Sequence, residues 1–211
     1  MPHPALSALR SLVDTRFPAS ARKTAAGLAT GIAALDAALD GGLPPGRLTE
    51  LVCPPGAGAQ SVLAQLLAVT RAASRRVALV DAADGFAPEA IPPDDLRHLV
   101  WARARSLTEA LGAADVLVRD GNYALVILDL RDVPARALNR TPASTWHRLH
   151  RVAEAQSAAV AVFSRHGLVP AVPRRVQLAR TANWTAPRAD WLRTLHVETL
   201  RGRPQLEALS A

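Results

Sequence analysis

The hydrophobic residues of this chain fall into short apolar runs separated by segments of mixed character. Four runs, at residues 47–53, 76–81, 123–130 and 158–164, are rich in apolar residues. Runs of this length that are rich in Val, Leu and Ile are typical of strands buried on both faces of a parallel sheet. A shorter apolar stretch at residues 98–103 predicts a further short strand.

Amphipathic segments lie between these runs. Residues 60–74, 106–120 and 143–157 place apolar side chains at helical spacing. A shorter helix is predicted within residues 30–42, where Thr30 can cap the first turn and two glycines end the helix. Strands that alternate with helices imply right-handed βαβ crossovers and a sheet covered on both faces. We therefore expect the α/β fold class, with a mostly parallel sheet flanked by helices.

The C-terminal part of the chain has a different pattern. Residues 174–184 and 191–202 alternate apolar with polar residues around a turn that contains proline. This alternation predicts antiparallel edge strands with one solvated face.

The N-terminal part is predicted to form an arm. A short amphipathic helix is followed by a polar stretch, so we expect a helical arm and linker over residues 1–29 and one domain over residues 30–211. The helix could dock in a groove of a neighbouring copy, which would make the protein a homo-oligomer, or fold back on its own domain. The apolar positions that would mediate self-association are Leu6, Leu9, Leu12 and Val13.

The composition is that of an ordinary globular protein, with 49% hydrophobic and 20% charged residues. Cys53 is the single cysteine, which excludes an intrachain disulfide. No apolar run approaches the roughly 20 residues that cross a bilayer, and the N-terminus lacks the pattern of a secretion signal. We therefore expect a cytoplasmic protein without a membrane partner.

The charge balance is strongly basic. The formal net charge is +7, and every basic residue except Lys23 is arginine. An excess of this size favours association with polyanions such as nucleic acid or acidic protein surfaces. The alternative is that arginine-rich coding bias accounts for much of the excess.

A glycine-rich segment, ELVCPPGAGAQSV, lies between the first predicted strand and the following helix. A phosphate-binding loop at such a place reads G-x-x-x-x-G-K-[ST], where the lysine reaches the phosphates and the hydroxyl holds magnesium. On that pattern Cys53 takes the first glycine, Gly58 the second, Ala59 the lysine and Gln60 the hydroxyl residue. Because the cation and the metal ligand are both missing, we expect no ATP hydrolysis, no catalytic residues and no nucleotide cofactor.

Two interpretations of this segment stay open. Either its glycines only permit a tight turn from strand to helix, or the loop retains some nucleotide affinity. Asp129, at the end of the third long apolar run, is either a polar strand terminus or a relic of a magnesium-binding aspartate. The residues of this vestigial nucleotide site are Gly56, Gly58, Gln60, Ser61 and Asp129.

Several of these segments resemble a known superfamily. The sequence TGIAALDAALDGGLPPGRLTELVCPPGAG resembles the segment that leads into the ATP loop of bacterial RecA recombinases. VALVDAADGFAP is similar to the RecA strand that ends in an aspartate followed by a catalytic glutamate, a position that here is Ala83. The resemblance implies a RecA-like core with antiparallel strands at its C-terminal end and an N-terminal arm through which subunits associate.

Within the RecA-like superfamily the chain is similar to the ImuA family of SulA-like accessory proteins. The phrases that carry this likeness are LTELVCPPGAGAQSVLAQLL, RLHRVAEAQSAAVAVFSR and LHVETLRGRP. The resemblance implies a role in the SOS response to DNA damage, as an adaptor for error-prone translesion synthesis. Its implied partners are an ImuB-like inactive polymerase homologue and an error-prone DNA polymerase, with RecA and single-stranded DNA as further partners.

The resemblance also suggests where DNA would be contacted. In RecA proteins two DNA-binding loops follow the strands that match residues 123–130 and 158–164 here, and the corresponding stretches of this chain are residues 131–144 and 165–175. Arginines in these loops could contact phosphates without reading bases, or they could form an ordinary solvated surface. The six candidates are Arg131, Arg136, Arg140, Arg165, Arg174 and Arg175.

Other side chains carry less specific signals. Trp146 has core spacing on its predicted helix, and packing is also expected for Trp191, whereas Trp184 is the best candidate for exposure and base stacking. His147 and His150 lack carboxylate or cysteine partners at ligand spacing, so we predict surface histidines and no metal site. Two other functions compete with the adaptor: an ATP-binding recombinase-like protein with weak ATPase activity, and a SulA-like inhibitor of cell division.

Overall fold

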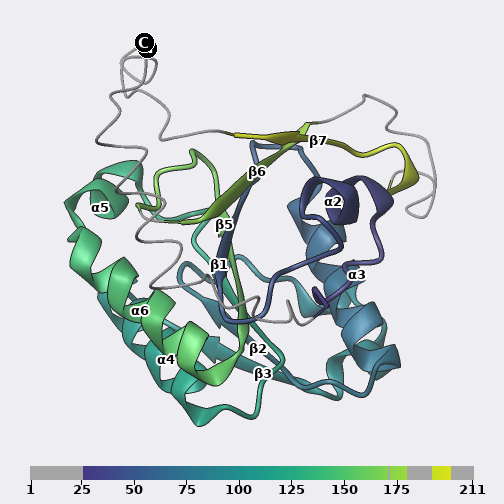
Figure 1. Ribbon diagram of the computed structural model, residues 1–211, viewed down its shortest axis with the longest axis horizontal. Helices are drawn as coiled ribbons and strands as arrows, with labels where there is room; N and C mark the ends of the chain where they lie inside the picture. Colours follow the sequence, from purple (N-terminus) through teal and green to yellow (C-terminus); the bar gives the residue numbers. More distant parts are fainter. Residues whose placement is uncertain (1–25, 171, 180–191, 201–211) are drawn as a thin grey trace, which may run out of the picture.

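The computed structural model describes residues 26–170, 172–179 and 192–200 of the chain. Its centre is a seven-stranded sheet in the order β3-β2-β4-β5-β1-β6-β7 (Figure 1). Every neighbouring pair is parallel except β6 and β7, which are antiparallel. The strands are β1 (Leu48–Val52), β2 (Val77–Asp81), β3 (Leu99–Arg103), β4 (Leu125–Asp129), β5 (Ala159–Ser164), β6 (Arg174–Ala179) and β7 (His196–Thr199).

Helices cover both faces of this sheet (Figure 1). One face carries α2 (Ala33–Ala38) and α3 (Ala59–Ala72), and two short 3-10 turns, η1 (Pro88–Ala90) and η2 (Pro93–Leu96), connect β2 to β3. The other face carries α4 (Leu107–Asp120), α5 (Ala135–Arg140) and α6 (Ala143–Gln156). The predicted α/β fold class is confirmed.

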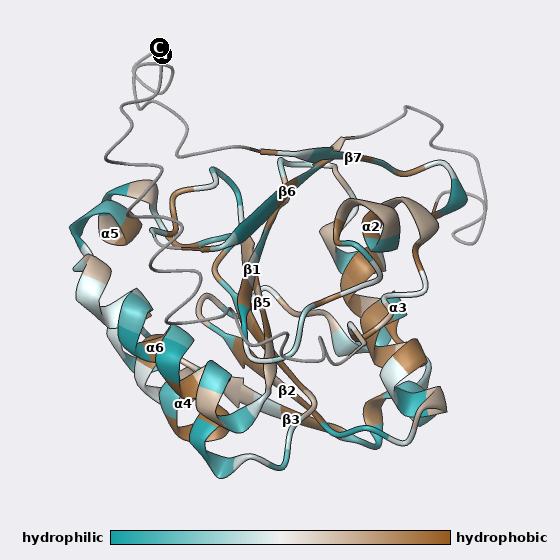
Figure 2. Cartoon of the chain, viewed as in Figure 1, coloured by the Kyte–Doolittle hydropathy of each residue, from teal (hydrophilic) through white to brown (hydrophobic). Residues whose placement is uncertain are grey.

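The sheet separates two hydrophobic cores. Leu51, Leu79 and Phe163 pack on the α2–α3 side, and neighbouring residues of the same strands, such as Leu48 and Val80, pack on the α4–α6 side. Because successive side chains of a strand point to opposite faces, a strand covered on both sides is apolar at most of its positions. Figure 2 shows the helices with apolar sides toward the sheet and polar sides outward.

One strand of the C-terminal part differs from the prediction. The pair β6–β7 is antiparallel as expected, but β6 is itself parallel to β1 and lies inside the sheet, so only β7 is an antiparallel edge strand. The alternating pattern reports which faces of a strand are solvated and carries no information on the direction of its neighbour. The stretch predicted as a loop over residues 165–175 therefore ends two residues earlier, where β6 begins.

The start of the domain also differs slightly from the prediction. Helix α2 begins only at Ala33, and the hydroxyl of Thr30 donates to the carboxylate of Asp36 at 2.8 Å instead of standing at the N-cap. Leu28 pairs with Leu43 through two backbone hydrogen bonds of 2.8 and 2.9 Å. The last residues of the predicted linker are thus joined to the domain.

Some predictions fall outside the described residues. These are the N-terminal helix with its self-association positions Leu6, Leu9, Leu12 and Val13, and the placement of Trp184 and Trp191. Among the helices that the structure does describe, none combines the length and apolar character required to cross a membrane.

A buried ion pair links three strands of the sheet. The Nε of Arg175 on β6 donates to Oε2 of Glu50 on β1 at 2.6 Å, and the two side chains are 6% and 0% exposed. The other carboxylate oxygen of Glu50 accepts from the hydroxyl of Ser164 on β5 at 2.6 Å. A terminal nitrogen of Arg175 also donates to the carbonyl of Val169 at 2.6 Å. The connection from β5 to β6 is therefore fixed by side chains as well as by the sheet.

Removing either member of this pair should destabilise the domain strongly. We expect Arg175→Ala or Glu50→Ala to lower the free energy of unfolding by about 3–5 kcal/mol, because each leaves a buried charge without its partner. The apolar double variant Glu50→Leu/Arg175→Met should lose less than either single variant. Urea denaturation followed by circular dichroism measures all three.

Arg174 provides the matched control at the adjacent position. Its ion pair with Asp40 is short, at 2.6 Å, but exposed, with side chains 39% and 73% accessible. Exposed pairs contribute at most about 1 kcal/mol, so Arg174→Ala should change stability little. Equal losses for Arg174→Ala and Arg175→Ala would contradict a structural role for the buried pair.

Candidate functional site

The glycine-rich loop lies at the carboxyl-terminal edge of the sheet, between β1 and α3. It begins at Cys53, whose backbone N–H donates to the carbonyl of Ser164 at 2.7 Å. Gly56 and Gly58 have φ values of 76° and 75°, in the left-handed region that glycine adopts without a steric penalty. Gly58 is the N-cap residue of α3, and its carbonyl accepts from the backbone N–H groups of Ser61 and Val62. Both glycines are therefore required for the tight turn from strand to helix.

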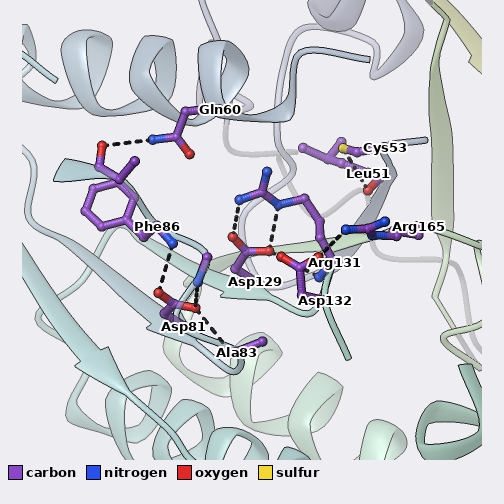
Figure 3. Close-up of polar contacts among 12 residues, drawn as sticks. Leu51, Cys53, Gln60, Asp81, Ala83, Phe86, Asp129, Arg131, Asp132 and Arg165 are labelled. Carbon is purple, nitrogen blue, oxygen red and sulfur yellow. Dashed lines mark hydrogen bonds and ion pairs between the residues drawn. The ribbon is translucent and has the colours of Figure 1, made fainter. Parts of the chain in front are cut away.

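The two positions that would carry the lysine and the hydroxyl are occupied differently. Ala59 is buried in the first turn of α3. Gln60 is partly buried, and its side-chain amide donates to the backbone carbonyl of Ala87 at 3.2 Å (Figure 3). Gln60 thus joins α3 to the segment that follows β2, and its nitrogen is used within the protein.

Asp129, at the end of β4, is held by an arginine two residues further on. Nε and a terminal nitrogen of Arg131 donate to the two carboxylate oxygens at 2.8 and 2.5 Å, and the backbone N–H of Arg131 donates to Oδ1 at 3.2 Å (Figure 3). The two side chains are 15% and 4% exposed. Burial acts to lower the pKa of Arg131, but the hydrogen bonds and charge of Asp129 outweigh it and raise that pKa above its usual value. This closed, bidentate pair fixes the guanidinium as a permanent cation at the strand end.

The second buried carboxylate of this edge, Asp81 at the end of β2, is satisfied by backbone groups. Its oxygens accept from the N–H groups of Ala83, Gly85 and Phe86 at 3.3, 3.0 and 3.1 Å. The carboxylate therefore shapes the loop after β2. Ala83, at the place of a catalytic glutamate in the resemblance to RecA, has no group that could position water.

The residues of the glycine-rich loop and of the neighbouring strand ends do not fit a magnesium-bound nucleotide. The metal-binding hydroxyl is replaced by an amide that already has a partner, and both oxygens of Asp129 accept hydrogen bonds from Arg131. Burial raises the pKa of the Cys53 thiol at the base of the loop, so the thiol is neutral at physiological pH and supplies no anionic ligand. Among the described residues, no group of three His, Cys, Asp or Glu side chains is arranged to hold a metal ion.

The six arginines predicted to contact DNA or a partner separate into four environments. Arg175 is a correction, because it is buried against Glu50 on β6 and cannot reach a ligand without breaking that pair. Arg131 is a partial correction, because its guanidinium is engaged by Asp129. Arg165 and Arg174 are accessible but form ion pairs with Asp132 and Asp40.

Arg136 and Arg140 are the two candidates that remain available. Both are exposed on the short helix α5, within a stretch that the sequence predicted as loop. Within the described part of the chain, neither side chain forms an ion pair or a hydrogen bond.

Two tryptophans are described and both pack within the protein. Trp146 of α6 is fully buried, as its helical spacing predicted. Trp101 of β3 meets Phe86 edge to face at a centroid distance of 5.2 Å, and the guanidinium of Arg103 lies 5.1 Å from its ring. Neither ring is presented for base stacking.

The sequence analysis missed the Asp129–Arg131 pair, although its signal was available. Aspartate and arginine stand two residues apart at the end of a buried strand, in the sequence LDLRD. An arginine in this position can fold back on the carboxylate that a metal would otherwise require.

Restoring the loop residues alone should not restore a working nucleotide site. We expect Ala59→Lys/Gln60→Thr to bind a fluorescent ATP analogue with magnesium weakly, and the same variant with Arg131→Gln to bind about ten-fold tighter, because Asp129 becomes free to accept from a metal-bound water. Fluorescence anisotropy measures both. Adding Arg136→Gln instead is the matched control and should have no effect. Equal affinities with and without Arg131→Gln would contradict the inference that Arg131 keeps Asp129 from a metal-bound water.

Comparisons with known proteins agree with this architecture. Residues 27–77 match a family of unknown function (DUF7125). RecA of Rubrobacter xylanophilus is 35% identical over 113 residues, which are 52% of this chain and 33% of that protein. RecA of Streptomyces venezuelae is 34% identical over 91 residues, 42% of this chain and 24% of that protein.

A solved structure extends the likeness beyond the sequence matches. The crystal structure of the RadB recombinase superposes with a TM-score of 0.59 and 21% identity, over 74% of this chain and 84% of that one. The matched region spans only about a third and a quarter of the two RecA proteins, so the likeness concerns the core domain. The shared fold and the partial sequence similarity together place this chain in the RecA-like superfamily.

Proposed function

We propose that this chain is a non-catalytic RecA-like accessory protein of the DNA-damage response, which supports error-prone translesion synthesis by binding partner proteins and DNA. The observation that carries the proposal is the bidentate Asp129–Arg131 pair at the edge of the sheet where a RecA-like enzyme would hold its metal. The chain's own guanidinium satisfies the carboxylate, and no metal ion is needed there.

The electrostatics of phosphoryl transfer support the absence of catalysis. The transition state is stabilised almost entirely by positioned cations and a metal ion around the transferring group. Here Ala59 and Gln60 supply neither a cation nor a hydroxyl at the loop, and Ala83 supplies no base. Arg131 places a cation at this edge, but its Nε and one of its terminal nitrogens donate to Asp129.

The role in translesion synthesis rests on the sequence. The partial similarity to RecA supports a place in DNA transactions, and the phrases similar to the ImuA family support the narrower role. The partners in this proposal are an ImuB-like inactive polymerase homologue and an error-prone DNA polymerase, with RecA and single-stranded DNA as further partners. An adaptor of this kind would work in the cytoplasm, where those partners act.

The adaptor should show binding without turnover. We expect the purified protein to release no phosphate from ATP with magnesium and single-stranded DNA, because the charges that stabilise the transition state are missing. In cells, deletion of the gene should lower damage-induced mutation, and a Gln60→Ala variant should restore mutation fully. A phosphate-release assay and a mutation-frequency assay measure these effects.

Two outcomes would favour the competing functions. Magnesium-dependent turnover that is lost in the Gln60→Ala variant would support an ATP-binding recombinase-like protein with weak ATPase activity. Filamentation of undamaged cells on overexpression, together with normal mutation frequency in the deletion strain, would support a SulA-like inhibitor of cell division.

Direct DNA contact is expected at α5. Arg136 and Arg140 are exposed and have no intramolecular partner among the described residues. Replacing both with glutamine should weaken binding of oligothymidylate, and the slope of log affinity against log salt should become shallower by about 1.4, two phosphate contacts at about 0.7 each. Fluorescence anisotropy across a salt series measures the slope. An unchanged slope would place the DNA contact elsewhere or exclude it.

A further inference from the structure

A hollow lined by arginines lies on the helical face of the domain, away from the glycine-rich loop. Its volume is about 340 Å³, and α4 and α6 provide its lining residues. The lining residues are Arg119, Arg148, Arg151, Val152, Ala155 and Gln156.

The position of this hollow follows from the topology. Helix α4 ends at Asp120, just before β4, and α6 ends at Gln156, just before β5. The C-terminal turns of both helices therefore lie toward the amino-terminal edge of the sheet. The glycine-rich loop follows the carboxyl end of β1, at the opposite edge. The two features cannot belong to one small-molecule site.

The guanidinium groups are held in place from one side. Asp115, on α4, accepts from Nε of Arg119 at 2.7 Å and forms a longer ion pair with Nε of Arg148 at 3.5 Å. Arg119 and Arg148 remain about half exposed, at 55% and 56%. Arg151 is exposed one turn further along α6 and has no ion pair or hydrogen bond with any described residue. Asp115 thus faces two of the three guanidinium groups, and the residues that line the hollow carry three positive charges and no negative charge.

The hollow also offers apolar surface. Val152 and Ala155 line it between the arginines. Val116, which is 66% exposed, lies three residues before Arg119 on α4, so the two are neighbours on the helix surface. A site that joins guanidinium groups to apolar surface suits a ligand that carries carboxylates and apolar side chains together.

We propose that this hollow binds an acidic, leucine-rich segment of a partner protein. Carboxylates of the segment would accept from Arg119, Arg148 and Arg151, and an apolar side chain would cover Val152 and Ala155. A nucleic-acid backbone fits less well, because it would leave the apolar surface uncovered and Glu154 interrupts the basic residues of α6. The inference deepens the adaptor role and rests on it only for the identity of the partner.

The test uses the full chain and a fluorescein-labelled peptide of alternating glutamate and leucine pairs. We expect the peptide to bind with an affinity that falls about ten-fold in Arg148→Gln/Arg151→Gln. The matched control is Arg136→Gln/Arg140→Gln on α5, which removes the same charge elsewhere and should leave peptide binding unchanged. Arg151→Gln alone should still weaken binding. It removes no ion pair or hydrogen bond with the part of the chain that the structure describes, which makes it a milder change to the fold than the double variant.

Three results would overturn the inference. The first is equal peptide affinity for the native chain and the α6 double variant. The second is equal affinity for a peptide in which serine replaces leucine, which would show that the apolar surface is not used. The third is a native chain that does not bind the peptide, together with an α6 double variant that loses oligothymidylate binding. That result would assign the hollow to nucleic acid. None of these results bears on mutation frequency, so the wider adaptor proposal can stand or fail separately.

Discussion

Three carboxylates buried in or at the end of the central strands have to be satisfied for this domain to be stable. Glu50, Asp81 and Asp129 are 0%, 1% and 4% exposed, and a buried charge without a partner costs several kcal/mol. Each is satisfied by the chain itself: Glu50 by Arg175, Asp129 by Arg131 and Asp81 by backbone N–H groups. In an enzyme of this fold, carboxylates at strand ends would be left partly unsatisfied, ready for a metal or a water. Here the carboxylates at the strand ends accept hydrogen bonds from the chain itself, which stabilises the domain and leaves them unavailable to a metal.

The sequence predicted the sheet and helices well because their signals are local. Mostly apolar runs predicted β1, β2, β4 and β5 to within two residues at each end, since a strand covered on both faces is apolar at most of its positions. The fate of Arg175 could not be predicted in this way. Its partner Glu50 lies 125 residues earlier, and no local pattern marks a pair that forms only when β6 aligns with β1.

The candidate site was predicted in part for the same reason. The missing lysine, hydroxyl and glutamate could be identified by position, and the glycines of the loop have the conformation that a tight turn requires. The arginine predictions were weaker, because an arginine's role depends on whether a carboxylate lies nearby in space. Asp129 and Arg131 are close in sequence, so their pair was accessible to reasoning from the residues. The pairs of Arg165 with Asp132 and of Arg174 with Asp40 join distant segments and were not.

The arginine excess acts on two length scales. At long range the whole chain carries a net charge of +7, which steers any polyanion toward it regardless of which arginines are paired. At contact distance, paired and unpaired arginines differ, because a guanidinium that must first leave a buried carboxylate gains little from a phosphate. Arg131 and Arg175 are paired in this way, whereas Arg136, Arg140 and Arg151 are exposed and form no ion pair within the described residues. If both proposals hold, net charge would govern the rate of encounter, and the helical surfaces on α5 and α6 would govern which ligand is retained.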